Sequence, residues 1–422
     1  MKKWTYEATL ATLLMLGFGV AFMDRSRASV LMPMIARDFK PSYAEVGLAI
    51  GIVGLTWGIF DIIGGTLSDR FGRKTLLVPS VLVFSATSWI AGLATNIREL
   101  TFMRGFMGAG EGTYLASSSA WMGEEAKPER RGFDIGVIYL GASLFGSALG
   151  PIVITWMATQ NFYGTGWRFP FFALASVGFL MAAIIYRFTH EPPSILESRR
   201  AEKTRGKPTD SSLSLRKIAE VLKHRNMILC MALAIVYMPV QFMHMMYGPL
   251  YMDAVRHWDI MTIGQVMSFM GLGGAIGMAG GGRLSDYIGR KTMVVISFAL
   301  SAFCGYWFFF LATTPLTAIL SSFFLGICAF PIPTCVFAAI PVETVGFEHG
   351  ALASGLSNGM GEIFGAFLLS SSAGELADIY GIQAVGYVLV TCAIVGLIVS
   401  LFLRETAPRI LARKESTHEL HA

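Results

Sequence analysis

Apolar segments of membrane-spanning length recur along the whole chain, and they limit the possible folds more than any other feature. An α-helix rises about 1.5 Å per residue, so roughly 20 apolar residues cross the roughly 30 Å of hydrocarbon in a bilayer. Of the 422 residues, 54% are hydrophobic and 14% are charged, a composition far more apolar than that of soluble domains. We predict an all-α membrane protein with twelve transmembrane helices, at residues 8–37, 45–67, 76–95, 99–122, 133–158, 168–188, 226–252, 261–282, 292–312, 316–338, 350–373 and 382–403.

The first of these spans begins near the N-terminus. Lys2 and Lys3 precede an apolar run that contains Asp24 and Arg25 and lacks a small-residue cleavage site. We interpret this segment as a spanning helix and not as a removed signal peptide.

A polar stretch from Arg187 to Arg225 divides the twelve spans into six and six. We predict an N-terminal six-helix bundle (1–188), a cytoplasmic linker with an amphipathic helix (189–225), and a C-terminal six-helix bundle with a cytoplasmic tail (226–422). With both termini in the cytoplasm, most basic residues outside the spans lie on the cytoplasmic side, as the positive-inside rule requires. The net charge of +5 then describes a surface that faces anionic lipid, so we expect a bilayer and no nucleic acid as partner.

One eleven-residue segment occurs twice, about half a chain length apart. The residues from Gly65 to Thr75 read GTLSDRFGRKT, and those from Gly282 to Thr292 read GRLSDYIGRKT. Such spacing indicates two parallel, pseudo-symmetric halves.

The chemistry of this repeated segment follows from its residue types. We expect the first glycine of each copy, Gly65 or Gly282, to allow close approach of two helices. The second glycine, Gly72 or Gly289, is expected to adopt a positive φ in a turn. The acidic residue of each copy is expected to lie at a helix end.

Both copies match the pattern GxLxDxxGRK between the second and third spans of a half, and on this motif the chain resembles the major facilitator superfamily of transporters. The resemblance implies that the acid and the basic residues after it latch a cytoplasmic gate. The gating residues would be Asp69, Arg70, Arg73, Asp286 and Arg290.

Ionisable residues inside the spans are concentrated in the first half. Such residues are costly in hydrocarbon and mark function by default. The first half contains Asp24, Arg25, Arg27, Asp61, Arg104 and Glu111, whereas the second half has Gln241, Ser321 and Cys328 at the positions equivalent to Asp24, Arg104 and Glu111. We predict a charged first half and a polar second half.

Arg104 and Glu111 are two helical turns apart, so both point to the same side at heights separated by about 10 Å. One helix can therefore present a cation to a substrate anion and a carboxylate to a proton. Glycines between and beside them leave room for a ligand or for a neighbouring helix.

The roles of the charges in the first span are open. Asp24 and Arg25 point about 100° apart on a helix, and they either serve transport or brace the first span against the fourth. We expect Arg27 to reach the outer interface by snorkelling. Asp61 is expected to have a structural role near the gate.

The second half offers polar residues deep in its seventh and eleventh spans. His244 is expected to be a hydrogen-bonded residue of a cavity wall, with Gln241, Tyr237 and Tyr247 close by. Glu362 follows Asn358 by one turn, and it is either a second protonation site or a packing contact.

The sequence Phe22-Met23-Asp24-Arg25, taken with Arg104 and Glu111, resembles the anion:cation symporter family of sialin-like carriers, vesicular glutamate carriers and bacterial sugar-acid carriers. Tyr247-Gly248-Pro249-Leu250-Tyr251 and Asn358 agree with that pattern. From the resemblance and the residue chemistry we expect substrate binding by Arg25, Arg104, Gln241, His244, Tyr247 and Asn358. Proton coupling is expected at Asp24, Glu111 and Glu362.

Two departures from that pattern bear on an alternative, and the second of them weakens drug:proton exchange. Glu111-Gly112-Thr113-Tyr114 also resembles Spinster-like lipid carriers, and Gly146-Ser147-Ala148-Leu149-Gly150-Pro151 resembles the start of the drug:proton antiporter signature, although Ile152-Val153-Ile154 replaces its closing glycines. The alternative is therefore export of a lipid or amphipathic drug in exchange for protons.

The preferred function is symport of a small organic anion, such as a sugar acid or other carboxylate, with protons. HExxH and a phosphate loop with lysine do not occur in the sequence, so we predict no enzyme and no ATP-driven pump. We expect no metal site and no cofactor, with the proton gradient as energy source. The expected form is a monomer in the plasma (bacterial inner) membrane.

Overall fold

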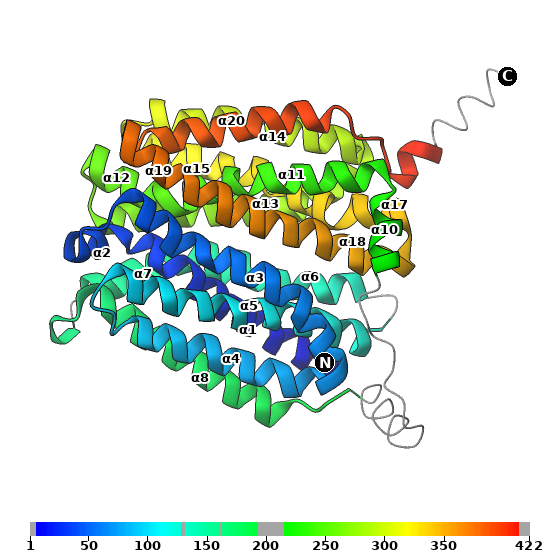
Figure 1. The fold of residues 1–422 in the computed structure, drawn as a ribbon, viewed down its shortest axis with the longest axis horizontal. Coiled ribbons are helices and arrows are strands. Elements are labelled where there is room, and N and C mark those ends of the chain that lie inside the picture. Colours follow the sequence, from blue (N-terminus) through cyan, green and yellow to red (C-terminus); the bar gives the residue numbers. More distant parts are fainter. Residues whose placement is uncertain (1–5, 128–130, 161, 193–214, 413–422) are drawn as a thin grey trace, which may run out of the picture. The chain divides into compact units, whose positions relative to one another are not determined.

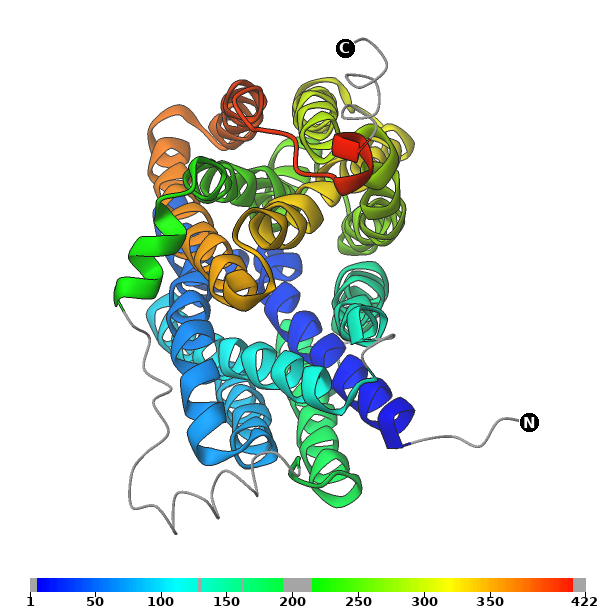
Figure 2. The same ribbon diagram turned by 90° about the vertical axis from the view of Figure 1, so that its right-hand side faces the viewer.

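The computed structural model describes residues 6–127, 131–160, 162–192 and 215–412. Its contacts divide the chain into two units, of which the first holds 1–40 and 52–213 and the second holds 41–51 and 214–422. Each unit is built of helices that run side by side in both views (Figure 1, Figure 2). Much of the predicted linker lies outside the described residues, so its boundaries stay predictions.

The first unit contains the helices of the N-terminal half. They are α1 (Tyr6–Val30), α2 (Met32–Phe39), α3 (Tyr43–Phe71), α4 (Arg73–Ala91), α5 (Ile97–Glu125), α6 (Arg131–Gly141), the π-helix η1 (Ala142–Leu149), α7 (Gly150–Thr159), the short 3-10 helices η2 (Phe162–Gly164) and η3 (Gly166–Arg168), and α8 (Phe169–Phe188).

The second unit begins with a short helix from the predicted linker, α10 (Leu215–Leu222). It continues with α11 (Arg225–Phe242), η4 (Met243–Tyr247), α12 (Gly248–Arg256), α13 (Ile260–Ile288), α14 (Arg290–Tyr306), η5 (Trp307–Leu311), α15 (Pro315–Ala329), α16 (Pro331–Pro333), η6 (Thr334–Ala339), α17 (Ile340–Val345), α18 (Phe347–Met360), η7 (Gly361–Leu369), α19 (Ser370–Tyr380) and α20 (Ala384–Ser400).

These elements make up the twelve predicted spans. Within the described residues, nine helical segments are long and apolar enough to cross a membrane. The other three spans are α5, which carries several charges, the segment α18–η7–α19, and α20, an apolar helix of 17 residues. The prediction of an all-α membrane protein with twelve transmembrane helices is confirmed.

Several spans are interrupted where the sequence analysis expected single helices. In the first span, α1 ends at Val30 and the chain continues as α2, whose first turn contains Pro33. Pro151, Pro239 and Pro341 lie beside or just before π-helical turns. Proline removes a backbone donor, and a local π-turn lets the freed carbonyls find other partners in a membrane.

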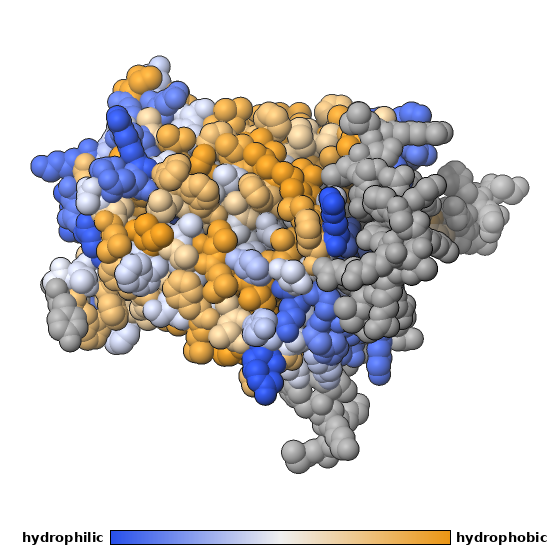
Figure 3. Space-filling model, turned by 60° about the horizontal axis from the view of Figure 1, so that its bottom comes forward, coloured by the Kyte–Doolittle hydropathy of each residue, from blue (hydrophilic) through white to orange (hydrophobic). Residues whose placement is uncertain are grey.

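The exposed surface of the spans is apolar. Leu180, Phe102 and Ile379 are among many large hydrophobic side chains that are more than half exposed. Hydrophobic side chains cover most of the face in Figure 3, and hydrophilic ones gather toward its ends. This is the surface that a hydrocarbon solvent requires.

The turns of the repeated segment follow the prediction in part. Gly72 and Gly289 have φ of 93° and 102°, and each precedes the first residue of a helix, α4 or α14. The expectation for Gly65 and Gly282 is wrong, because a Cβ added to either would meet no atom of the described residues within 4 Å. Within the described part of the chain, neither glycine mediates a close helix contact.

The first turns of α3 belong to the second unit and pack on α19. The backbone N–H groups of Tyr43 and Ala44 donate to the two carboxylate oxygens of Asp378, at 2.8 and 2.9 Å. Ser371 donates to the carbonyl of Gly47 at 3.3 Å. The later part of α3 packs on α5 in the first unit, so one helix contributes to both.

Glycines of α5 let α3 approach closely. A Cβ added to Gly108 would lie 2.6 Å from the carbonyl oxygen of Val53 and 2.3 Å from Oγ1 of Thr56, whereas one added to Gly105 would meet only Ile52, at 3.6 Å. We expect Gly108→Ala to destabilise the protein by about 1–3 kcal/mol through overpacking.

The matched control for this prediction is Gly105→Ala, one turn earlier on the same helix. Its new methyl group makes an ordinary contact, so its thermal unfolding in detergent should match that of the wild type. Equal unfolding temperatures for the two variants would contradict the close α3–α5 contact.

Candidate functional site

Five charged side chains are buried together in the first unit. Asp24, Arg25 and Arg27 come from α1, and Arg104 and Glu111 come from α5; each is at most 4% exposed. They are close enough to interact electrostatically with one another. We call these residues the charge cluster, which has a formal charge of +1 when both acids are ionised.

Arg27 connects α1 to two other helices, α4 and α8, through hydrogen bonds. Its Nη1 donates to the carbonyls of Pro170 and Phe171 at 3.0 and 3.4 Å, and its Cζ lies 4.1 Å from the Phe171 ring centroid. Its Nη2 contacts the carboxylate of Asp24 and the hydroxyl of Ser88. The expectation that Arg27 snorkels to the interface is wrong. Its side chain is fully buried, and α8 and α4 supply its hydrogen-bond acceptors and an aromatic ring.

Asp24 is tied to the third span. Its Oδ1 accepts from Arg27 and, at 2.6 Å, from the hydroxyl of Ser88 on α4. The hydrogen bonds of its carboxylate therefore brace α1 against α4. They do not run to the fourth span, α5, which was the brace considered from the sequence.

Arg25 points to aromatic rings. Its Cζ lies 4.6 Å from the ring of Trp57 on α3 and 5.9 Å from that of Phe22. A guanidinium over an aromatic face is stabilised by the ring quadrupole. The aromatic faces can therefore hold this cation in place in the absence of a bound anion.

Arg104 and Glu111 lie on the same buried side of α5. Arg104 donates from Nη2 to the carbonyl of Arg25 at 3.5 Å, which links α5 to α1. Both carboxylate oxygens of Glu111 are buried, and neither has a hydrogen-bond partner among the described residues. Such a group is a strong candidate for a functional role, since an unpaired buried charge is costly.

The glycines around these two residues serve the neighbouring helices. A Cβ on Gly110 would lie 2.8 Å from the carbonyl oxygen of Ser80 on α4, and one on Gly112 would lie 2.5 Å from that of Trp57 on α3. Of the two uses left open by the sequence, close helix packing is the one that the structure shows. The three helices thus enclose the charge cluster.

The predicted polar residues of the second unit contact different partners. Tyr237 donates to Oε1 of Gln241 at 3.0 Å and is close enough to Glu362, on η7, to interact electrostatically. Asn358 precedes Glu362 by one turn and is partly buried. Gln241 and Glu362 therefore lie near one tyrosine.

His244 and Tyr247 have different partners from Tyr237 and Gln241. His244 is fully buried, with Nε2 2.8 Å from the hydroxyl of Ser322 and its ring 4.3 Å from that of Phe308. Tyr247 donates to the carbonyl of Ser370 at 3.1 Å, and its hydroxyl lies where a Cβ of Gly47 would be. The expected roles of these four polar residues and of Glu362 in binding and coupling stay predictions.

Each copy of the repeated segment forms an ion-pair network around its arginine. In the first, Arg73 lies 2.5 Å from Asp69 and 2.5 Å from Glu124, the latter at the end of α5. Arg70 is exposed, with its guanidinium over the ring of Phe71. Both carboxylates that flank Arg73 are thus held at the ends of helices of its own unit.

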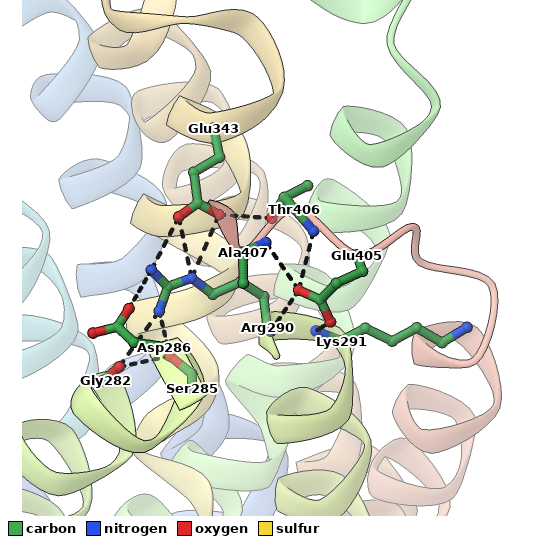
Figure 4. Close-up of polar contacts among 9 residues, drawn as sticks. All are labelled: Gly282, Ser285, Asp286, Arg290, Lys291, Glu343, Glu405, Thr406 and Ala407. Atoms are coloured by element: carbon green, nitrogen blue, oxygen red, sulfur yellow. Dashed lines mark hydrogen bonds and ion pairs between the residues drawn. The ribbon is translucent and has the colours of Figure 1, made fainter. Parts of the chain in front are cut away.

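The second network repeats this arrangement (Figure 4). Arg290 lies 2.6 Å from Asp286 and 3.0 Å from Glu343 on α17. Its backbone N–H donates to Oε1 of Glu405 at 2.7 Å, and the N–H of Lys291 donates to Oε2 at 3.2 Å. Glu405 thereby caps the N-terminus of α14 with its negative charge.

Sequence reasoning missed the glutamates of both networks. Glu191 accepts from the backbone N–H of Thr75 at 3.3 Å in the first unit, in the place that Glu405 takes in the second. Each of these glutamates follows the last span of its half and stands shortly before a proline, as Glu191-Pro192 and Glu405-Thr406-Ala407-Pro408. That shared pattern is the signal that could have identified them.

Comparison with known proteins identifies the family. The model of the Major Facilitator Superfamily matches residues 14–368 and 281–420, and the chain belongs to this superfamily. Its relatives include the hexuronate transporter of Bacillus subtilis (strain 168), 27% identical over 65% of this chain and 63% of the relative, and the probable L-galactonate transporter of Escherichia coli (strain K12), 24% identical over 87% and 81%. The first alignment thus spans less than two thirds of the Bacillus protein.

A solved structure of similar fold is that of a bacterial homologue of the human lysosomal transporter Spinster, in an inward-facing occupied conformation. It has a TM-score of 0.74 and 16% sequence identity, and the match covers 95% of this chain and 96% of that one. At this identity the likeness concerns the fold alone. The prediction of a facilitator-type transporter, and not an enzyme, is confirmed by the family and by its named relatives.

The cap on α14 can be tested by removing its carboxylate. The carboxylate of Glu405 accepts hydrogen bonds from the backbone N–H groups of Arg290 and Lys291, and also from those of Thr406 and Ala407. Glu405→Ala removes this acceptor from all four. We expect a loss of about 1–2 kcal/mol in stability, the usual value for a helix cap, measured by thermal unfolding in detergent. The control is Glu375→Ala at an exposed position of α19, and indistinguishable unfolding of the two variants would contradict the capping role.

Proposed function

We propose that the protein is a secondary transporter that carries a small organic anion, such as a sugar acid or other carboxylate, together with protons by alternating access. The observation that carries this proposal is the charge cluster. It combines three buried arginines, which favour an anion, with Glu111, a buried carboxylate that has no hydrogen-bond partner among the described residues.

Arg25 and Arg104 are the groups proposed to bind the substrate. Arginine presents several donors in a planar fork that matches a carboxylate, and the buried setting strengthens each charge-assisted bond. Arg25 lies over aromatic faces and Arg104 contacts the backbone of α1. An arriving carboxylate can join both guanidinium groups without disturbing the ion pair of Arg27 with Asp24.

Glu111 is proposed to carry a coupled proton. Neutralising a buried carboxylate removes most of the cost of burying it, and its charge interacts with those of Arg25 and Arg104. Protonation makes the cluster more positive and so favours the anion, while the anion in turn favours protonation. This reciprocity is a coupling free energy between two ligands, and the proton gradient supplies the energy without a cofactor.

The named relatives support an acidic substrate. The Bacillus subtilis relative is a hexuronate transporter, and two Escherichia coli relatives are named as probable transporters of L-galactonate and of galactarate and D-glucarate. All these compounds carry a carboxylate beside hydroxyl groups. Lipid or drug export, the alternative from the sequence, rests on a likeness to Spinster that is one of fold only.

We further propose that the protein acts as a monomer in a bacterial inner membrane with both termini in the cytoplasm. The concentration of basic residues in the loops of the repeated segment and in the linker supports this orientation. The Bacillus subtilis and Escherichia coli relatives agree with a bacterial membrane.

Uptake by purified protein in liposomes tests the proposal. With an acidic exterior, we expect accumulation of glucuronate, galactonate or galactarate. Arg104→Ala should weaken substrate binding roughly a hundredfold, which corresponds to about 3 kcal/mol.

Glu111→Gln should abolish accumulation driven by the proton gradient and retain exchange of internal for external substrate, because exchange needs no net proton movement.

The control for these measurements is Glu375→Gln, on the exposed side of α19, which should transport as the wild type does. Failure to accumulate any carboxylate, together with unaltered behaviour of Glu111→Gln, would overturn the proposed function.

A further inference from the structure

The contacts of Arg27 set it apart from the other arginines of the charge cluster. Its Nη1 donates to two carbonyls at the start of α8, its Nη2 contacts Asp24 and Ser88, and its guanidinium stacks on Phe171. The side chain is fully buried. Arg27 could therefore bind a substrate only by giving up its contacts with both α4 and α8.

Asp24 is the counter-ion of this anchored cation. Its Oδ1 accepts from Arg27 and Ser88, and its Oδ2 is buried without a hydrogen-bond partner. A proton on Asp24 would occupy Oδ2 and would remove the negative charge that Arg27 faces. Breaking a buried ion pair from one side is strongly destabilising, because the remaining charge stays buried and uncompensated.

The other charges around Asp24 add to this effect. Arg25 is its neighbour on α1, Arg104 faces it from α5, and Glu111 is the one other acid of the charge cluster. From α4 and α8 the pair receives a hydroxyl, two carbonyls and an aromatic ring. Arg104 therefore acts on Asp24 in addition to its direct partner, Arg27.

Glu111 differs from Asp24 in having no such contact. Both of its oxygens are buried, and neither accepts a hydrogen bond from a described residue. Gaining or losing a proton at Glu111 therefore breaks no hydrogen bond to a described residue. The two acids of the charge cluster are thus held in different ways: Asp24 is in a hydrogen-bonded ion pair, whereas Glu111 has no hydrogen-bond partner in the described part of the chain.

We propose that Arg27 is a positioning residue that fixes Asp24 as an anion, so that the charge cluster exchanges one proton per transport cycle, at Glu111. This inference rests on the proposed proton-coupled transport, and it narrows the expectation that Asp24 and Glu111 both titrate. The charge cluster then alternates between formal charges of +1 and +2. The state of higher charge, with Glu111 protonated, is the one that receives the anionic substrate.

Infrared spectroscopy of the purified protein in detergent tests the proposal without any transport. The C=O stretch of a protonated carboxyl group absorbs apart from that of an ionised one, so a pH titration counts the buried acids that exchange protons. We expect a titrating signal in the wild type that disappears in Glu111→Gln and persists in Asp24→Asn. Loss of that signal in Asp24→Asn would overturn the proposal.

Arg27 variants test the positioning role itself. Arg27→Gln should add a second titrating signal, from the released Asp24, and the double variant Arg27→Gln/Asp24→Asn should lack it. Arg27→Lys keeps the positive charge and should add none. If Arg27→Gln folds and adds no signal, the positioning role is wrong; if it does not fold, the comparison of Asp24→Asn with Glu111→Gln still decides which acid titrates.

Transport stoichiometry gives a second, separate readout. In liposomes loaded with galactonate, the reversal potential reports protons moved per substrate. Relative to the wild type, Arg27→Gln should raise this number by one, and an unchanged number would count against the proposal. If no carboxylate is transported at all, the proposed function is wrong. The infrared titration still shows whether Arg27 keeps Asp24 ionised.

Discussion

A charge buried in a membrane protein must be balanced by the protein itself, because the surrounding hydrocarbon supplies no water. In the first unit this requirement is met by the Arg27–Asp24 pair, which joins α1 to α4 and, through carbonyls, to α8. The glycines of α5 complete the enclosure by bringing α3 and α4 within contact. The packing of α1, α3, α4, α5 and α8 thus depends on the burial of one ion pair.

The two copies of the repeated segment solve a different problem, the closure of each unit at one end. Arg73 and Arg290 each bind the acid of their own segment and a glutamate from a later helix. Glu191 and Glu405 then accept N–H groups at the start of α4 and α14. The duplicated sequence therefore gives a duplicated network, although the buried charges of the two halves differ completely.

Local sequence patterns predicted the spans and the turns, because hydropathy and glycine act within a few residues. The positive φ of Gly72 and Gly289 is such a case. The expectations for Arg27 and Gly65 were wrong because their environments depend on helices far away in the sequence: α8 supplies carbonyls to Arg27, and no atom of the described residues lies within 4 Å of a Cβ added to Gly65. The sequence predicts that Arg104 and Glu111 lie on one side of α5, whereas only the packed structure shows that Glu111 has no hydrogen-bond partner among the residues that it describes.

The cap formed by Glu405 means that residues 401–407, which follow α20, are part of the folded second unit. Lys291 also donates to the carbonyl of Leu401, and Thr406 donates to Glu343. Protein engineering at this end therefore has a natural limit: a fluorescent partner or an affinity tag joined after Ala407 leaves these bonds in place, whereas one joined directly to α20 would remove them.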